Sequence, residues 1–193
     1  MATSSLTIDR QSLAAIRIFL VFTVLLGLLY PAAVWAAGRV AFHGEATGSL
    51  VRKNGRVVGS SLIGQDFRGP QWFHGRASAT AYAGAASGGS NLAATDPRQQ
   101  AAVSAREKSL APLGGTLPPD ALTMSASSLD PDISPAYARL QARRVAAARD
   151  LGIAQVERLI GAATTGRDAG FLGDPKVNVL QLNLSLQNAS ERG

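Results

Sequence analysis

The chain of 193 residues contains no cysteine. This absence excludes a disulfide framework and a thiolate metal site, although it is compatible with either side of a bacterial membrane. Histidine is also scarce, because only His43 and His74 are present. Without a His-Glu-x-x-His spacing or a cysteine ligand, the sequence gives no support to a catalytic zinc centre.

Several motifs of phosphate binding and catalysis are missing as well. No Gly-x-x-x-x-Gly-Lys-[Ser/Thr] loop occurs, since Gly84, Gly88 and Gly89 lack the lysine that would follow them. The sequence also has no Gly-x-Ser-x-Gly elbow of a hydrolase, no Asp-Lys-Thr-Gly-Thr phosphorylation signature and no Gly-Tyr-Gly ion filter. We therefore expect an accessory protein with no catalytic residues of its own. If such a protein serves a pump, it is neither the phosphorylated chain nor the pore.

Acidic residues are the scarcer charged type, with 13 Asp and Glu against 19 Lys and Arg and a net charge of +6. A basic balance favours an anionic neighbour, such as lipid headgroups, a nucleotide or an acidic protein face. The charge alone does not choose among these partners.

The longest run without a formal charge covers residues 18–38, a stretch of 21 residues. At a rise of about 1.5 Å per residue, such a helix is roughly 31 Å long and matches the hydrocarbon thickness of a bilayer. Arg17 and Arg39 flank the run, where long side chains can reach the interface. The sequence predicts three parts: an N-terminal arm over 1–11, a transmembrane helix over 12–40 and a soluble domain over 41–193.

A cleaved signal peptide is the alternative, with Val34-Trp35-Ala36 as its cleavage site. The apolar core of a signal peptide usually has about 7–15 residues, so the longer run favours an anchor. Pro31 is expected to kink the helix, which membrane spans tolerate. Gly27 gives the span a small surface on which a partner helix could pack closely.

The orientation of this span is left open by its flanking charges. More basic residues follow the span than precede it, which by the positive-inside rule would place the domain in the cytoplasm. The rule weakens when a long segment is translocated, and about 155 residues follow the helix here. The counted residues are Arg10 and Arg17 before the span, and Arg39, Arg52, Lys53 and Arg56 after it.

The sequence predicts that the soluble part is a single α+β domain. Asn54-Gly55 lies between two short β-type runs and predicts a hairpin whose second strand continues to about residue 63. Asp96-Pro97 and Ser134-Pro135 are typical helix starts. The expected elements are a long loop over 67–94, helices over 97–110, 135–149 and 153–163, and a final strand over 177–186, where leucines alternate with polar residues and a bulge is expected at 179–180.

Two features of the domain are candidates for binding. The loop Ser87-Gly88-Gly89-Ser90-Asn91 could turn its backbone N–H groups toward an anion or a carbonyl. The alternative for this loop is an ordinary turn stabilised by its own Ser and Asn side chains.

The second candidate is Arg144, which projects onto the apolar stripe of its helix. A guanidinium on a buried face must be paired, because an unpaired buried charge is costly. Asp130 or Asp132 would be its internal partner, while the other reading has Arg144 reaching an acidic group on another protein. Arg139 and Arg143 are interpreted as a solvated face.

An ordered set of short motifs resembles the KdpC family, the C chains of bacterial Kdp-type potassium-transporting ATPases. The resemblance runs from about residue 15 to the C-terminus. The motifs are Gly64-Gln65-Asp66-Phe67, Arg76-Ala77-Ser78-Ala79, Ser87-Gly88-Gly89-Ser90-Asn91-Leu92, Leu129-Asp130-Pro131, Ile133-Ser134-Pro135, Arg144-Val145-Ala146 and Val177-Asn178-Val179-Leu180. The chain departs from the usual pattern at Ala77, Ser128 and Asp132, where the family usually has proline, glycine and histidine.

The resemblance implies a non-catalytic subunit of a four-chain, high-affinity potassium uptake pump. Its partners would be a KdpA-like pore chain, a KdpB-like P-type chain that hydrolyses ATP, a KdpF-like small peptide and membrane lipid, with no nucleic acid. The family is usually placed in the inner membrane with its domain on the periplasmic side. It is also described as a catalytic chaperone that raises the ATP affinity of the catalytic chain.

These implied properties conflict, because a domain across the bilayer cannot touch cytoplasmic ATP. We expect the domain to stabilise the pore chain from outside and to act on ATP use through conformational coupling. No cofactor would then be held stably. In the alternative, ATP is shared with the catalytic chain and contacts the Ser87–Asn91 loop directly.

Overall fold

The computed structural model describes residues 3–190 of the chain. It divides into two compact units, Met1–Ser49 and Leu50–Gly193, and each unit is considered by itself. The boundary follows the short helix α3 (His43–Ala46) and precedes the first strand.

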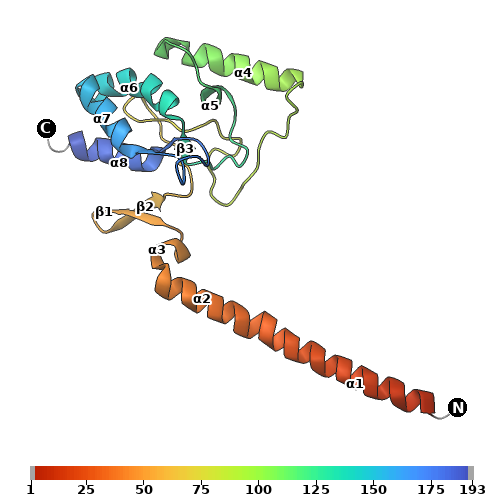
Figure 1. Ribbon diagram of the computed structural model, residues 1–193. Helices are drawn as coiled ribbons and strands as arrows, with labels where there is room; N and C mark the ends of the chain where they lie inside the picture. Colours follow the sequence, from red (N-terminus) through yellow and green to blue (C-terminus); the bar gives the residue numbers. More distant parts are fainter. Residues whose placement is uncertain (1–2, 191–193) are drawn as a thin grey trace. The chain divides into compact units, whose positions relative to one another are not determined.

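The first unit is helical almost throughout (Figure 1). It consists of α1 (Thr3–Val24), a π-helical segment (Leu25–Leu29), α2 (Tyr30–Ala41) and α3. The stretch Asp9–Ala41 is long and apolar enough to cross a membrane, as judged by its length and composition. None of its most apolar part is buried inside the chain, as expected of a surface that faces lipid or partner helices.

The π-helical segment lies just before Pro31, the residue at which the sequence predicts a kink. Tyr30 donates its N–H to the carbonyl of Leu25, five residues earlier, so the wider turn adjusts the hydrogen bonding before the proline. Farther along, the guanidinium of Arg39 lies 5.7 Å from the ring centre of Trp35. An aromatic ring and a cation together are typical of the interfacial end of a span.

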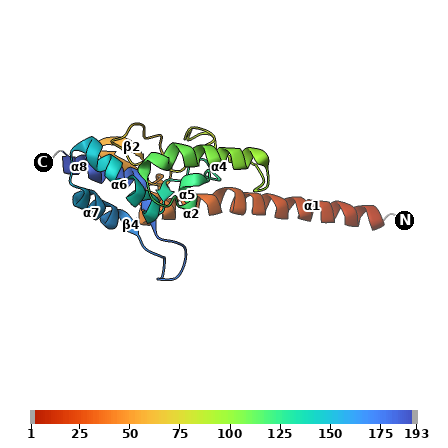
Figure 2. The same cartoon turned by 90° about the horizontal axis from the view of Figure 1, so that it is seen from above.

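The second unit is an α+β domain (Figure 2), as the sequence predicts. A hairpin of β1 (Leu50–Lys53) and β2 (Arg56–Ser60) precedes a long segment, residues 61–96, without helix or strand. The remaining elements are α4 (Pro97–Leu110), a 3-10 turn (Ala111–Leu113), α5 (Pro119–Leu122), β3 (Asp132–Ile133), α6 (Pro135–Arg149), α7 (Ile153–Ala163), β4 (Thr164–Thr165), β5 (Lys176–Asn178) and α8 (Val179–Ser190). Strands β3, β5 and β4 form a small antiparallel sheet in that order.

Local signals in the sequence determine the turn and the helix starts. Asn54 and Gly55 have φ angles of 51° and 77°, as a tight hairpin turn requires. The carboxylate of Asp96 accepts the N–H of Arg98 at 2.8 Å, and the hydroxyl of Ser134 accepts the N–H of Tyr137 at 3.0 Å. Both caps satisfy N–H groups that the first helical turn leaves without partners, so the predicted starts of α4 and α6 are confirmed.

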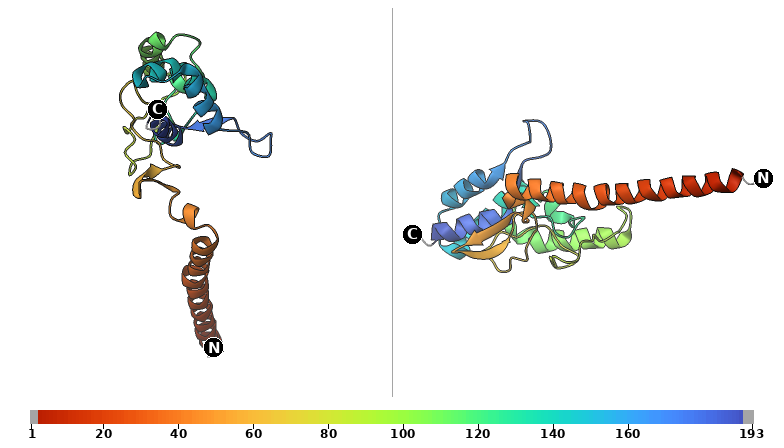
Figure 3. Two further views of the ribbon diagram at one scale, coloured as in Figure 1. Left: turned by 90° about the vertical axis from the view of Figure 1, so that its left-hand side faces the viewer. Right: turned by 90° about the horizontal axis from the view of Figure 1, so that it is seen from below.

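The core lies among α6, α7, α8 and β5, which Figure 3 shows grouped on one side of the domain. Val145 of α6, Val156 of α7 and Leu182 of α8 are fully buried. Phe73 from the long loop joins this core and is also fully buried. The loop therefore takes part in the packing of the domain.

The predicted strand over 177–186 is wrong. The strand ends at Asn178, whose side-chain oxygen accepts the N–H of Gln181 at 3.1 Å and caps α8. Val179, Leu182 and Leu186 are buried at helical spacing. A run of alternating leucines also places leucines four residues apart, and leucine is a strong helix former. The pattern is therefore compatible with a helix as well as with a strand.

We expect Leu182→Ala to lower the free energy of unfolding by about 2–5 kcal/mol, because the side chain is fully buried in α8. Leu184→Ala is the matched control: Leu184 is only partly buried, so its loss is smaller. Urea unfolding of the full chain in detergent, followed by circular dichroism, measures both. Equal losses would indicate the strand, in which the two leucines share one face.

Candidate functional site

Two buried amide side chains hold the backbone of the long loop against the helices. Asn183 of α8 accepts the N–H of Phe73 and donates to its carbonyl, both at 2.9 Å. Gln141 of α6 does the same for the next residue, His74, at 2.8 and 3.1 Å. Both amides are 1% exposed, so an unpaired backbone group there would be costly. We call Gln141 and Asn183 the amide clamp.

Arg144 extends this arrangement along the loop. Its guanidinium donates to the carbonyls of Pro70 at 2.7 Å and Trp72 at 3.0 Å, and to the side-chain oxygen of Gln141 at 2.7 Å. Burial lowers the pKa of Arg144, partly offset by Tyr137. Arg144 is therefore an internal strut, but the expected pairing with Asp130 or Asp132 is wrong: its partners are carbonyl oxygens of the loop.

Arg149, one turn and a half farther along α6, completes the contact with the same segment. Its Nε donates to the carbonyl of Gln71 at 2.7 Å. Its guanidinium lies 4.2 Å from the ring centre of Trp72, a close cation–π contact. The sequence analysis did not single out Arg149, although its position at the C-terminal end of α6 and the isolated Trp72 were both visible there.

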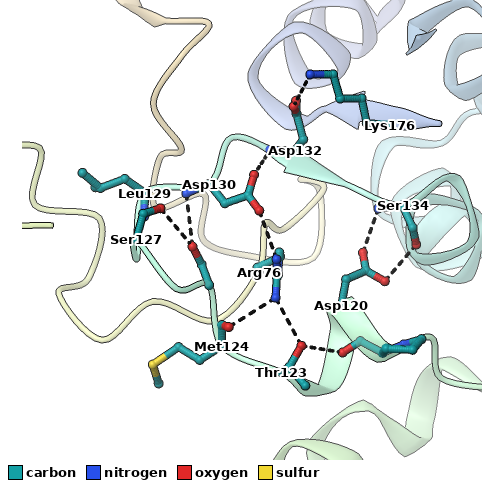
Figure 4. A network of polar contacts seen from close by, with 12 residues as sticks. Arg76, Asp120, Thr123, Met124, Ser127, Leu129, Asp130, Asp132, Ser134 and Lys176 are labelled. Atoms are coloured by element: carbon teal, nitrogen blue, oxygen red, sulfur yellow. Dashed lines mark hydrogen bonds and ion pairs between the residues drawn. The ribbon is translucent and has the colours of Figure 1, made fainter. Parts of the chain in front are cut away.

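Asp130 is paired with Arg76 (Figure 4). The two side chains meet at 3.1 Å, and the other terminal nitrogen of Arg76 donates to the hydroxyl of Thr123 and the carbonyl of Met124, both at 3.2 Å. The Nε of Arg76 is buried and has no hydrogen-bond partner among the residues that the structure describes. Arg76 thus joins the loop to the segment between α5 and β3, and it belongs to a motif that the resemblance already indicated.

The neighbouring carboxylates have partners of their own (Figure 4). Asp120 accepts both the N–H of Ser134 at 2.7 Å and its hydroxyl at 2.9 Å. Asp132, at a position where the resemblance leads us to expect histidine, lies 3.3 Å from the ammonium of Lys176 on β5. Among the described residues, no group of three or more His, Cys, Asp or Glu side chains is placed to hold a metal ion.

The Ser87–Asn91 loop lies along residues 125–128. Gly88 donates its N–H to the carbonyl of Ser127 at 3.1 Å, and the hydroxyl of Ser87 donates to the same oxygen at 3.2 Å. A Cβ at Gly89 would lie 2.9 Å from the carbonyl oxygen of Ala126, which explains a glycine there. The geometry is that of a packed turn, and the Gly88 N–H is already donated within the chain.

Ser128 stands at a position where the resemblance leads us to expect glycine, and its backbone conformation is one that glycine favours. Its φ of 62° lies in the left-handed region, where a side chain is strained. Its hydroxyl, fully buried, accepts the N–H of Ala79 at 2.8 Å and donates to the carbonyl of Gly88. These hydrogen bonds offset the strain and keep the conformation that glycine would adopt freely.

A cavity of about 400 Å³ lies beside this network and is lined by polar residues of the loop, including Asp66, Arg68, His74, Arg76 and Tyr82. Polar groups of the lining contact one another: Arg68 forms an ion pair with Asp66 at 2.6 Å, and the hydroxyl of Tyr82 donates to the carbonyl of Arg76. Burial raises the pKa of Tyr82 to about 12, so its phenol is neutral at physiological pH. Burial lowers the pKa of His74 in this lining, and its Nε2 lies 2.9 Å from the carbonyl oxygen of Gly69.

Gly27 lies in the π-helical segment of the first unit. Within the part of the chain that the structure describes, no atom lies within 4 Å of a Cβ built on Gly27, apart from the helix's own backbone. The chain itself therefore leaves this small surface open to a partner helix. That Gly27 contacts such a helix remains a prediction.

Comparison with known proteins gives a consistent result over nearly the whole chain. The family model of KdpC, the K+-transporting ATPase c chain, matches residues 12–188. The potassium-transporting ATPase KdpC subunit of Burkholderia vietnamiensis is 51% identical over 179 residues, covering 89% of this chain and 93% of the relative. Those of Burkholderia mallei and Burkholderia pseudomallei are 49% identical over 181 residues, covering 90% of this chain and 94% of each relative.

We expect Arg144→Lys to lower the free energy of unfolding by about 1–3 kcal/mol, because an ammonium cannot reach the carbonyls of Pro70 and Trp72 and the Gln141 oxygen together. Arg143→Lys is the control, since Arg143 is exposed and the change should stay within about 0.5 kcal/mol. Thermal unfolding of the full chain measures both. An Arg144→Lys chain of unchanged stability that binds its partners more weakly would instead support the reading in which Arg144 reaches an acidic partner.

Proposed function

Because this chain belongs to the KdpC family, the c chains of K+-transporting ATPases, we propose that it is a non-catalytic subunit of an ATP-driven potassium uptake pump. The observation that carries the proposal is the extent of the similarity: the match begins within α1 and ends within α8, so it includes both the candidate span and the domain. Assembly with a KdpA-like pore chain, a KdpB-like catalytic chain and a KdpF-like peptide is part of the proposal.

The first unit supports an anchoring role in the membrane. Its apolar side chains are exposed from Leu13 onward, and residues 3–190 place no atom outside the helix's own backbone within 4 Å of a Cβ at Gly27. Lipid alone gives helices little reason to associate, so small residues that let backbones approach are the usual contact points. We place the contact with the pore chain at Gly27.

Gly27→Leu should reduce recovery of the pore chain when the tagged protein is purified from detergent-solubilised membranes, because the leucine side chain keeps the two helices apart. Gly27→Ala is the matched control and should retain the complex, since alanine is also small. Among the described residues, no atom outside the helix's own backbone lies within 4 Å of a Cβ at this position. Equal recovery of the pore chain with all three proteins would remove Gly27 from the interface.

For the second unit we propose an indirect effect on ATP use, with the domain on the periplasmic face of the inner membrane. The domain would stabilise one conformation of the pump and thereby raise the ATP affinity of the catalytic chain, a coupling between distant sites. The packing of the Ser87–Asn91 loop supports this mechanism over direct contact, because Gly88 already donates its N–H to Ser127. In the alternative, ATP binds to that loop directly, which requires a cytoplasmic domain.

Trypsin added to intact spheroplasts distinguishes the two mechanisms. With a periplasmic domain, cleavage is expected at exposed basic residues such as Lys108 and Arg158, and the fragments appear on immunoblots. A cytoplasmic protein of the same cells serves as the control for membrane integrity. Protection of the domain in intact spheroplasts, with cleavage only after lysis, would contradict the indirect mechanism and favour direct nucleotide contact.

A further inference from the structure

The β1–β2 hairpin has one face packed on the domain and one face exposed. On the inner side, a Cβ at Gly59 would meet the side chains of Gln65 and Leu180, so the strands lie directly on the domain there. A β-bulge between Val51 and Arg52 changes the register, and Arg52 then pairs with Val57. We call Leu50, Arg52 and Val57 the outer face of the hairpin; all three side chains are exposed.

Charge on and around this outer face is of one sign. From Thr47 to Gln65 the sequence contains no Asp or Glu, while Arg52, Lys53 and Arg56 are cationic. Arg56 flanks the turn and is exposed, and Arg52 reaches back to the carbonyl of Gly55 at 3.2 Å. The apolar side chains beside these cations are 47% exposed at Leu50 and 48% at Val57. Basic and apolar side chains exposed together suit the headgroup region of a bilayer.

The hairpin is tethered close to the end of the candidate span. The span ends at Ala41 and β1 begins at Leu50, so the eight residues Phe42–Ser49 connect them. Eight extended residues reach at most about 28 Å, and the helical turn α3 shortens this reach. A chain anchored in a membrane therefore keeps its hairpin near the headgroups of that membrane.

We propose that the outer face of the hairpin binds anionic phospholipid headgroups of the membrane that the span crosses. Arg52 supplies the attraction from the outer face, and Leu50 and Val57 enter the interfacial layer beside it. Arg56 pairs with Lys53 and so starts from the opposite face, and it adds positive charge from its exposed position next to the turn. Each cation close to an anionic surface favours the bound state by about fivefold, so the two arginines together contribute at most about 25-fold. The proposal depends on Asp9–Ala41 crossing a bilayer, and it does not depend on assembly with a pump.

The occupant is lipid rather than a partner protein for two reasons. The surface has cations without the interspersed acidic residues that fix register in a protein interface. The tether also guarantees a high local concentration of headgroups, whatever else the chain binds. Coverage of this face by another subunit is a possible result of the experiment and would contradict the proposal.

The absence of cysteine makes the test direct, because Val57→Cys introduces a unique labelling site. The labelled full-length chain, carrying an environment-sensitive dye, is reconstituted in vesicles of phosphatidylcholine alone or with phosphatidylglycerol. Quenching by lipids brominated near the headgroup reports contact with the bilayer. We expect strong quenching in the anionic vesicles, at least twofold weaker quenching in the neutral ones, and a decline with added salt. A label at Leu50→Cys provides a second position if Val57→Cys lowers the helix content.

Two controls separate this contact from general proximity. Arg52→Gln with Arg56→Gln should remove most of the anionic-lipid quenching, whereas Arg139→Gln with Arg143→Gln, on the exposed side of α6, should not change it. A dye at Ser104→Cys on α4, which Figure 1 shows at the opposite end of the domain, should not be quenched. Equal quenching in neutral and anionic vesicles, insensitivity to the two arginines, or loss of quenching when the pump is assembled would each overturn the proposal.

Discussion

The domain depends on satisfying the backbone of a long segment that has no regular structure of its own. Residues 61–96 form neither helix nor strand, yet Phe73 from this segment lies fully buried in the core. Buried N–H and carbonyl groups cost free energy unless they are paired. Gln141 and Asn183, the amide clamp, pair two consecutive residues of the loop, and Arg144 takes the carbonyls before them. Side chains of helices α6 and α8 thus form the hydrogen bonds to the loop backbone that a neighbouring strand would form in a sheet.

The same principle applies at two positions where the resemblance leads us to expect other residues. Ser128 retains a left-handed backbone because its hydroxyl is bonded on both sides, to Ala79 and Gly88. Asp132, in place of histidine, is matched by Lys176 on the adjacent strand. The side chains of Ser128 and Asp132 are both paired within the domain. Polar groups of the loop region are therefore used mainly to hold the domain together.

The candidate binding features of the domain differ in whether their polar groups are already used by contacts within the chain. The Ser87–Asn91 loop is occupied by contacts to residues 125–128, and the cavity beside Arg76 is lined by paired charges. The outer face of the hairpin differs, because its cations and apolar side chains are exposed. The proposed attachment through the span and the proposed headgroup contact through the hairpin would together hold the domain at the bilayer.

The sequence by itself determined the features that depend on nearby residues. The uncharged run with arginines at both ends indicated the span, Asn54-Gly55 the hairpin, and Asp96 and Ser134 the helix starts. Two outcomes were decided only by tertiary structure: the helix over 179–190, and the partners of Arg144. Alternating leucines fit a strand or a helix, and the pairing of Asn183 with Phe73, 110 residues away, is compatible only with the packed helix. Arg144 likewise finds its carbonyls more than 70 residues away along the chain. Such contacts leave no local pattern, because the partner is a backbone atom that every residue carries.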